Sequence, residues 1–266
     1  MIFLFLFTFQ CKIEALNILE TLNFIFILII GLIGGFFDTF VGAGSLITIP
    51  TLIFLGLPPS IAIATNRLGV TGSDISGWYK FHKKKFIDYK IAIVLAIPSL
   101  LGSIIGANLV LEFNESLLKK IVAIMTILIM ILIILNPSIG IEKNKKKILK
   151  KKYYAAVFLS FIVGIYGGFY GAGAGIFIFY ILILFFDQTF LESAATRKLA
   201  NLSFSAMAAI VFAYKGIINY LWVIPLFVGT LTGAYFSAHY SEKIGNVWIK
   251  RLFIMIVLVM VLKLLI

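Results

Sequence analysis

Charged residues are scarce in this chain of 266 residues, and the shortage excludes a water-soluble protein. Asp, Glu, Lys and Arg make up 13% of the sequence, hydrophobic residues make up 62%, and the mean hydropathy is +1.10. A soluble domain is about a quarter charged, because polar side chains must cover its surface. We therefore predict an integral protein of the cell inner (plasma) membrane that crosses the lipid bilayer several times.

Residues that build metal centres and nucleophilic sites are also few. The chain has one cysteine, Cys11, which excludes an intrachain disulfide, and two histidines, His82 and His239, which lie far apart in the sequence. It contains no H-E-x-x-H motif and no G-x-x-x-x-G-K-[ST] motif, which argues against a zinc protease and against a pump with its own nucleotide site. We expect no catalytic residue, no metal and no cofactor.

The sequence is dominated by long apolar runs. Runs of about 20 residues can cross the hydrocarbon as helices, and the alternating pattern of a membrane β-barrel is absent. We predict an all-α polytopic membrane protein with about 8 transmembrane helices. The predicted spans are 21–37, 61–80, 89–111, 117–136, 153–170, 190–213, 219–239 and 247–266, and two shorter apolar segments are 45–57 and 174–186.

The formal net charge is +12, and its placement fits a membrane protein. Much of the excess lies in KFHKKKFIDYK (80–90) and EKNKKKILKKK (142–152), between predicted spans. Lys and Arg in short loops favour the cytoplasmic side of a membrane, so we place both loops there. This placement explains the charge without nucleic acid, which we do not expect as a partner.

The two halves of the chain resemble each other. The matches, in the same order, are GGFFDTFVGAGS (34–45) with GGFYGAGAG (167–175), ATNRL (64–68) with ATRKL (195–199), FIDY (86–89) with IINY (217–220), and IPSLLGSIIGANL (97–109) with IPLFVGTLTGAYF (224–236). Internal duplication is common among secondary transporters. If the two short segments each cross the membrane, the second copy is inverted, and the loop charges favour that relation.

We accordingly divide the chain into four parts. The predicted parts are an N-terminal extension (1–20), a first transmembrane repeat (21–140), a basic cytoplasmic linker (141–152) and a second transmembrane repeat (153–266).

Each half interrupts its apolar run with a glycine cluster, in VGAGSLITIP (41–50) and YGAGAGIFIF (170–179). A helix broken inside a membrane leaves peptide N–H groups unpaired, so the break must face protein or a wet cavity. A helix that starts after the break directs its positive end there. We predict that both breaks meet around one anion; the alternative is two kinks that only pack against other helices. The predicted binding residues at the breaks are Gly42, Gly44, Ser45, Gly171 and Gly173.

Polar residues after the breaks add candidate ligands. Arg67 in AIATNRLGV and the pair Arg197-Lys198 in AATRKLANLS lie at matching places in predicted spans. A cation inside a membrane is costly and suggests a partner, although these side chains could instead extend to the interface. We predict Arg67 and Arg197 as substrate ligands. The other predicted ligands are Thr65, Asn66, Thr196 and Asn201.

Two acidic residues lie close to these segments. Asp38 precedes the first glycine cluster, and Asp74 lies on the predicted span 61–80. Both are candidates for proton coupling, and Asp38 could alternatively pair with Arg67.

The glycine and arginine segments carry a resemblance to a known family. They read GGFFDTFVGAGSLITIPTLIFLGLPPSIAIATNRL in the first half, and GGFYGAGAGIFIFYILILFF followed by AATRKL in the second. Over about residues 21–266, the chain resembles the TauE/SafE family of sulfite exporter-like permeases. The resemblance implies a polytopic inner-membrane transporter in two related halves, and family members are associated with small sulfur-containing anions such as sulfite and organosulfonates.

The sequence as a whole favours a secondary transporter, or permease, for a small anion, with a sulfur-containing oxyanion or organosulfonate such as sulfite as the expected substrate. Proton coupling and assembly into a homo-oligomer are both compatible with it. Two alternatives stay open, a passive anion channel and a membrane-embedded enzyme. Duplication around one central site favours the carrier over the channel, whose filter is usually built by oligomeric symmetry.

Overall fold

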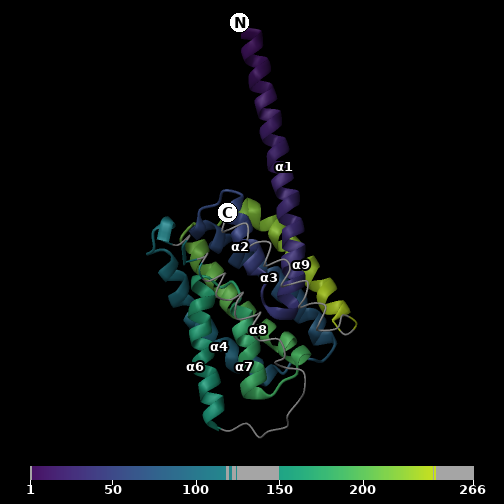
Figure 1. Cartoon of the computed structure of the whole chain (residues 1–266), viewed down its shortest axis with the longest axis vertical. Coiled ribbons are helices and arrows are strands. Elements are labelled where there is room, and N and C mark those ends of the chain that lie inside the picture. The colour runs from purple at the N-terminus through teal and green to yellow at the C-terminus, as the bar shows by residue number, and fades with distance from the viewer. Residues whose placement is uncertain (1, 118–119, 122–123, 125–149, 242, 244–266) are drawn as a thin grey trace.

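The computed structural model describes residues 2–117, 120–121, 124, 150–241 and 243. These residues form helices joined by short turns, and none of them lies in a strand, which confirms the all-α prediction (Figure 1). The predicted spans 117–136 and 247–266 and the linker 141–152 lie almost wholly outside the described residues. The helices are α1 (Ile2–Val41), α2 (Ser45–Phe54), α3 (Pro59–Lys83), α4 (Tyr89–Val110), α6 (Lys150–Phe169), α7 (Ala174–Phe186), α8 (Phe190–Tyr214) and α9 (Tyr220–Tyr240).

Four of these helices contain segments that are long and apolar enough to cross a membrane. The segments are Glu20–Phe40 of α1, Tyr89–Val110 of α4, Lys151–Phe169 of α6 and Tyr220–Tyr240 of α9. The part of α1 before this segment extends beyond the bundle (Figure 1). The chain is therefore a multi-pass membrane protein, as its composition predicts.

The helices α3 and α8 are long but polar, with 25 residues each. They pack against each other, and the helices α1, α2, α4, α6, α7 and α9 pack around them. Polar and charged groups inside a membrane protein face the bundle interior rather than lipid. The predicted spans 61–80 and 190–213 thus exist as helices, and the surrounding protein explains why they carry charges.

The short helices α2 and α7 turn back instead of crossing the bundle. Leu52, near the end of α2, belongs to one apolar cluster with Ile27 of α1. Phe186, at the end of α7, contacts the ring of Tyr153 near the start of α6, with centroids 6.4 Å apart. Each short helix therefore returns toward the side from which its long partner comes, so α1–α2 and α6–α7 are helical hairpins.

The two halves exchange equivalent hydrogen bonds. Thr65 of α3 accepts one at 3.1 Å from the backbone N–H of Asn219, the residue before α9. Thr196 of α8 accepts one at 3.1 Å from the N–H of Asp88, the residue before α4. Both partners also cap the helices that they precede, through Oδ1. A pseudo-twofold axis between the halves would produce such an exchange, as the predicted duplication requires.

Corresponding helices run in opposite directions. The early part of α3 lies beside the late part of α8, since Arg67 approaches Ser205, and the late part of α3 lies beside the early part of α8, since Gly77 approaches Lys198. The hairpins follow the same pattern in Figure 1, where α2 and α7 return toward opposite ends of the bundle. These opposite directions agree with the predicted inverted relation of the two halves. The prediction assumed that both short segments cross the membrane, whereas α2 and α7 each turn back as part of a hairpin.

The basic segments gather at one end of the bundle. Helices α4 and α6 pack in parallel, because Ser99 lies against Gly164 and Ser103 against Gly168 one turn further along both. The lysine-rich loop before α4 and the lysine-rich start of α6 therefore share an end. A shared end is what the predicted cytoplasmic placement of both segments requires.

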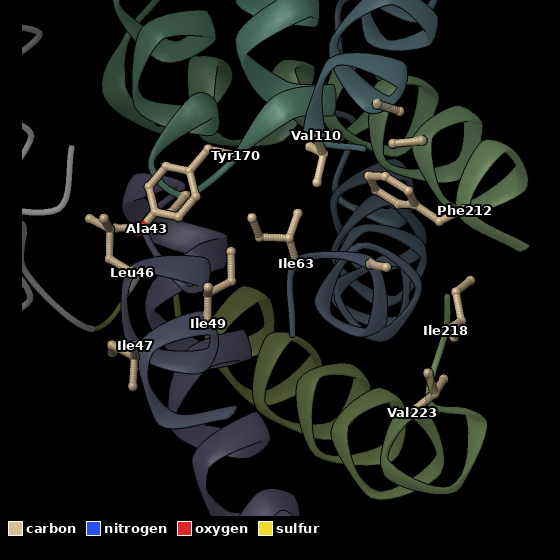
Figure 2. Packing of buried hydrophobic residues seen from close by; sticks show 14 of the residues in the cluster. Ala43, Leu46, Ile47, Ile49, Ile63, Val110, Tyr170, Phe212, Ile218 and Val223 are labelled. Atoms are coloured by element: carbon tan, nitrogen blue, oxygen red, sulfur yellow. The ribbon is translucent and has the colours of Figure 1, made fainter. Parts of the chain in front are cut away.

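Apolar side chains join the two hairpins. Figure 2 shows Ala43, from the turn between α1 and α2, close to Tyr170, from the turn between α6 and α7. Both are fully buried. Members of the same cluster on surrounding helices are Leu46 and Ile49 of α2, Ile63 of α3, Val110 of α4 and Phe212 of α8. This cluster fixes the two turns beside each other.

Glycines let the outer helices touch backbone to backbone. A Cβ added to Gly106 of α4 would overlap the carbonyl oxygen of Ile165 in α6, and a Cβ added to Gly35 of α1 would overlap that of Thr230 in α9. Small residues favour helix packing in membranes because they allow close van der Waals contact. In lipid, the hydrophobic effect contributes little to the association of helices. The two seams join α4 to α6 and α1 to α9, which are partners from different halves.

We predict that Gly106→Val destabilises the protein while Ala213→Val does not. The valine at position 106 must push α4 and α6 apart, and such overpacking costs about 1–3 kcal/mol; Ala213 is exposed on α8. Thermal unfolding in detergent, followed by size-exclusion chromatography, measures the difference. Equal midpoints for both variants and the wild type would contradict the close packing of α4 on α6.

Candidate functional site

The two helix breaks meet in the middle of the bundle. Gly42 ends the first long helix with φ +80° and Gly171 follows the second with φ +71°, a backbone conformation that residues with a Cβ rarely adopt. A Cβ added to Gly42 would lie 2.5 Å from the carbonyl carbon of Gly175. Glycine at these positions therefore permits both the reversal of the chain and the contact between the hairpins.

A small, mostly polar cavity lies between the breaks. The volume in which the centre of a water molecule fits is about 10 Å³, close to the minimum that one water molecule needs. The walls come from both hairpins and from α3 and α8. The lining residues are Asp38, Gly42, Ser45, Arg67, Val70, Asp74, Gly171, Gly175, Asn201, Phe204 and Ser205.

Two helices start at this cavity. Ser45 opens α2 and Gly175 is the second residue of α7, and both line the walls. The N-terminus of a helix carries a partial positive charge and directs N–H groups outward, which favours a nearby anion. Two such starts from opposite directions make the cavity electropositive even before side chains are considered.

Arg67 brings a buried guanidinium group to the cavity. Arg67 as a whole residue is 1% exposed to solvent. Nη2 donates to Ser45 Oγ at 3.0 Å, and Nη1 makes long contacts to the Gly167 carbonyl oxygen (3.4 Å) and to Ser205 Oγ (3.5 Å). Nε has no hydrogen-bond partner among the described residues. A Cβ on Gly171 would overlap this guanidinium group, so the glycine leaves room for it.

Arg197 supplies a second buried guanidinium group. Its Nη2 donates to the carbonyl oxygens of Asp38 and of Thr39, the latter at 2.9 Å, and so holds the end of α1. Its Nε and Nη1 have no hydrogen-bond partner within the described part of the chain. A Cβ on Gly175 would lie 2.7 Å from Nη1 and 2.8 Å from Asn201 Nδ2. Unpaired donors at a fully buried residue carry a desolvation penalty that an anionic ligand would relieve.

Lys198 holds the two carboxylates of the site. Its ammonium group lies 2.6 Å from Asp38 Oδ2 and 3.4 Å from Asp74 Oδ1, and it is fully buried. Ser73 Oγ donates to the same Asp38 oxygen at 2.6 Å. The expected alternative partner of Asp38, Arg67, makes no such ion pair among the described contacts. Lys198 occupies the place in the second half that Arg67 occupies in the first, but Lys198 is paired with carboxylates whereas Arg67 contacts neutral oxygen atoms.

Some predicted residues lie around the cavity rather than in its wall. Asn66 donates to Ser45 Oγ at 2.9 Å and accepts from Thr48, which fixes the start of α2. Thr65 and Thr196 bond to the backbone N–H groups of Asn219 and Asp88, as described above. A Cβ on Gly44 would overlap the Gly34 carbonyl oxygen, so Gly44 packs α2 against α1.

The remaining predicted residues lie in the turn before α7, in the cavity wall or directly behind it. Gly173 precedes α7 with φ +74° and so belongs to the turn. The predicted residues in the wall are Asp38, Gly42, Ser45, Arg67, Asp74, Gly171 and Asn201, and Arg197 lies directly behind Gly175.

Sequence reasoning missed Lys198 as the partner of both carboxylates, although its match with Arg67 in ATNRL and ATRKL was a usable signal. It also left out Gly175, Ser205 and Phe204 as wall residues. Phe204 and Ser205 both sit about two turns after Arg197 on α8, but only the contact between α3 and α8 shows which face they present.

A polytopic membrane protein with a buried polar cavity at converging helix breaks has the architecture of a membrane transporter. Comparison with known sequences then identifies the protein family. The sequence model of the family described as Sulfite exporter TauE/SafE matches residues 27–264, and the chain belongs to this family.

Similar curated proteins bear transporter names. A probable membrane transporter protein of Haemophilus influenzae is 25% identical over 88% of this chain and 91% of its own length. The probable membrane transporter protein YfcA of Escherichia coli is 28% identical over 89% and 87%, and YdhB of Bacillus subtilis is 28% identical over 84% and 90%. No solved structure matches the chain. The protein is thus a membrane transporter of this family.

We predict that Lys198→Met strongly destabilises the protein, because it removes the ammonium group that contacts both buried carboxylates. Removing one partner of a buried ion pair costs about 3–5 kcal/mol. The double variant Lys198→Met with Asp38→Asn should regain part of the loss. Thermal unfolding of the two variants measures the coupling; an unchanged midpoint for Lys198→Met would contradict the ion-paired cluster.

Proposed function

We propose that this protein is a secondary transporter that carries a small anion through the central cavity. The observation that carries the proposal is the buried positive charge: Arg67 and Arg197 lie beside two helix N-termini and have N–H groups without a hydrogen-bond partner among the described residues. An anion with two or more oxygen atoms can accept two parallel hydrogen bonds that lie in the plane of a guanidinium group. We infer transport rather than catalysis, because the similar proteins are named transporters.

The substrate that fits best is a sulfur-containing oxyanion or an organosulfonate such as sulfite. The family description names sulfite export. The donors around the cavity, Arg67, Ser45, Ser205 and Asn201, suit the oxygen atoms of a sulfonyl group, which accept several hydrogen bonds at once. Substrate binding would use the residues in the wall together with Arg197 behind it.

Asp38 and Asp74 are the proposed sites of proton coupling. Both line the cavity, and both contact Lys198. A proton taken up by either carboxylate would remove one of the two negative charges beside Lys198, which would favour the bound anion and link the two binding events.

A carrier suits the cavity better than a passive channel does. The space is close to that of one water molecule, and apolar residues of both hairpins pack beside it. A channel needs a wet path through the membrane, whereas a carrier holds its substrate in a closed site and opens to one side at a time. The opposite directions of α3 and α8 supply two related sets of helices for such alternation.

We predict that Arg67→Gln lowers sulfite transport about tenfold or more, whereas Lys84→Gln leaves it unchanged. A hydrogen bond to a charged group contributes about 1.5–3 kcal/mol, and 1.4 kcal/mol is a factor of ten. Lys84 donates to the His239 carbonyl oxygen at the end of the bundle, outside the cavity. Flux into proteoliposomes with purified protein measures both, and equal rates in well-folded variants would remove Arg67 from the binding site.

We further predict saturable uptake that internal unlabelled anion accelerates. A carrier returns faster when it is loaded, so counterflow is expected; a channel gives neither saturation nor counterflow. The measurement is labelled sulfite uptake into vesicles with and without internal sulfite. A linear, non-saturating flux together with conductance in planar bilayers would favour the channel instead.

A further inference from the structure

We infer that the cavity selects singly charged over doubly charged anions, and that Asp74 sets this preference. The inference rests on the proposed function and deepens it, because it states the charge of the substrate that the site accepts. It follows from the number of buried charges around the cavity and from how each of them is held.

The buried charges leave one positive charge uncompensated. Five residues of the Asp, Glu, Lys and Arg types are buried in the bundle interior in the described part of the chain: Arg67, Arg197, Lys198, Asp38 and Asp74. With both carboxylates ionised, three cations face two anions. An uncompensated charge is expensive in an interior of low dielectric constant. A singly charged anion brings the site to neutrality, whereas a doubly charged anion leaves a buried negative charge in place of the positive one.

The carboxylates differ in how firmly they are held. Asp38 accepts from Lys198 and Ser73 at 2.6 Å each, so its charge belongs to a closed local network. Asp74 has one contact of this kind, at the longer distance of 3.4 Å from Lys198, and it lines the cavity. Replacing Asp74 with a neutral residue therefore removes a charge that the ligand senses, with less loss of structural contacts than at Asp38.

The polar and apolar parts of the cavity wall also favour a singly charged anion. Val70 and Phe204 form an apolar part of the lining, and the donors Arg67, Ser45 and Asn201 lie in the polar part, which also contains two carboxylates. An anion with its oxygen atoms on one side and an alkyl group on the other would match both parts once the cavity, now close to the size of one water molecule, has widened. Sulfate carries oxygen atoms on all sides, and those that face Val70 and Phe204 would lose their hydration without a donor in return.

The test compares binding of methanesulfonate and of sulfate to purified full-length protein at one mildly alkaline pH. The wild type should bind methanesulfonate about tenfold or more tightly than sulfate. In Asp74→Asn the ratio of the two affinities should fall about tenfold or more, since one extra positive charge favours the dianion. Asp74→Glu keeps the charge and should retain the wild-type ratio. The different hydration of the two anions contributes equally to the ratio in every variant, so it cancels when the ratios of two variants are compared.

Each result decides between distinct conclusions. Equal affinities in the wild type would overturn the inference on charge while leaving anion transport in place. A ratio unchanged by Asp74→Asn would remove Asp74 from the selection. Binding of neither methanesulfonate, sulfate nor sulfite by the wild type would instead contradict the proposed function itself. If Asp74→Asn does not fold, competition of the two anions against labelled sulfite uptake by the wild type still tests the preference.

Discussion

The burial of three cationic side chains inside a membrane protein is the constraint on which the rest of the structure depends. A single charge at the centre of a bilayer is costly, and it persists only with a partner or in a wet cavity. Lys198 finds its partners in two carboxylates, and Arg197 finds part of its partners in the backbone at the end of α1. Arg67 keeps the fewest strong contacts. The free donors that result are the physical basis for an anion site.

The fold follows from the need to enclose these charges. The polar helices α3 and α8 occupy the interior, and apolar helices joined by glycine seams surround them. Glycine is also required where the hairpins turn, since Gly42 and Gly171 have positive φ angles and lie against the other hairpin or a guanidinium group. The same residue type thus serves two purposes, close packing of long helices and access of backbone to the site.

Much of the architecture could be predicted from the sequence because its signals are local. Apolar runs indicate a helical membrane protein, which the structure confirms; the cytoplasmic placement of the lysine-rich loops and the duplication of the halves stay predictions. The glycine clusters indicate the helix breaks, and Arg67 with Asp38 and Asp74 indicates the polar centre. Each of these features depends on residues that are neighbours in the chain or that repeat in order.

The rest depends on contacts between distant segments, which composition and periodicity do not encode. Whether a short apolar segment crosses or turns back depends on its packing against the preceding helix, as for Leu52 beside Ile27. The partner of Asp38 is Lys198, 160 positions away. Thr65 and Thr196 have the polarity of ligands, yet their hydroxyl groups bond to helix N-termini of the other half. Their placement follows from how α3 and α8 meet α9 and α4.

The most direct test of the account is an experimental structure with an anion that can be located without ambiguity. Bromomethanesulfonate carries one charge, and its bromine gives an anomalous signal in a crystal. The account predicts bound anion between Gly42 and Gly171, with sulfonate oxygen atoms within hydrogen-bond distance of the Arg67 guanidinium group. Anion bound only at the membrane interface, or continuous helices through residues 42 and 171, would contradict it.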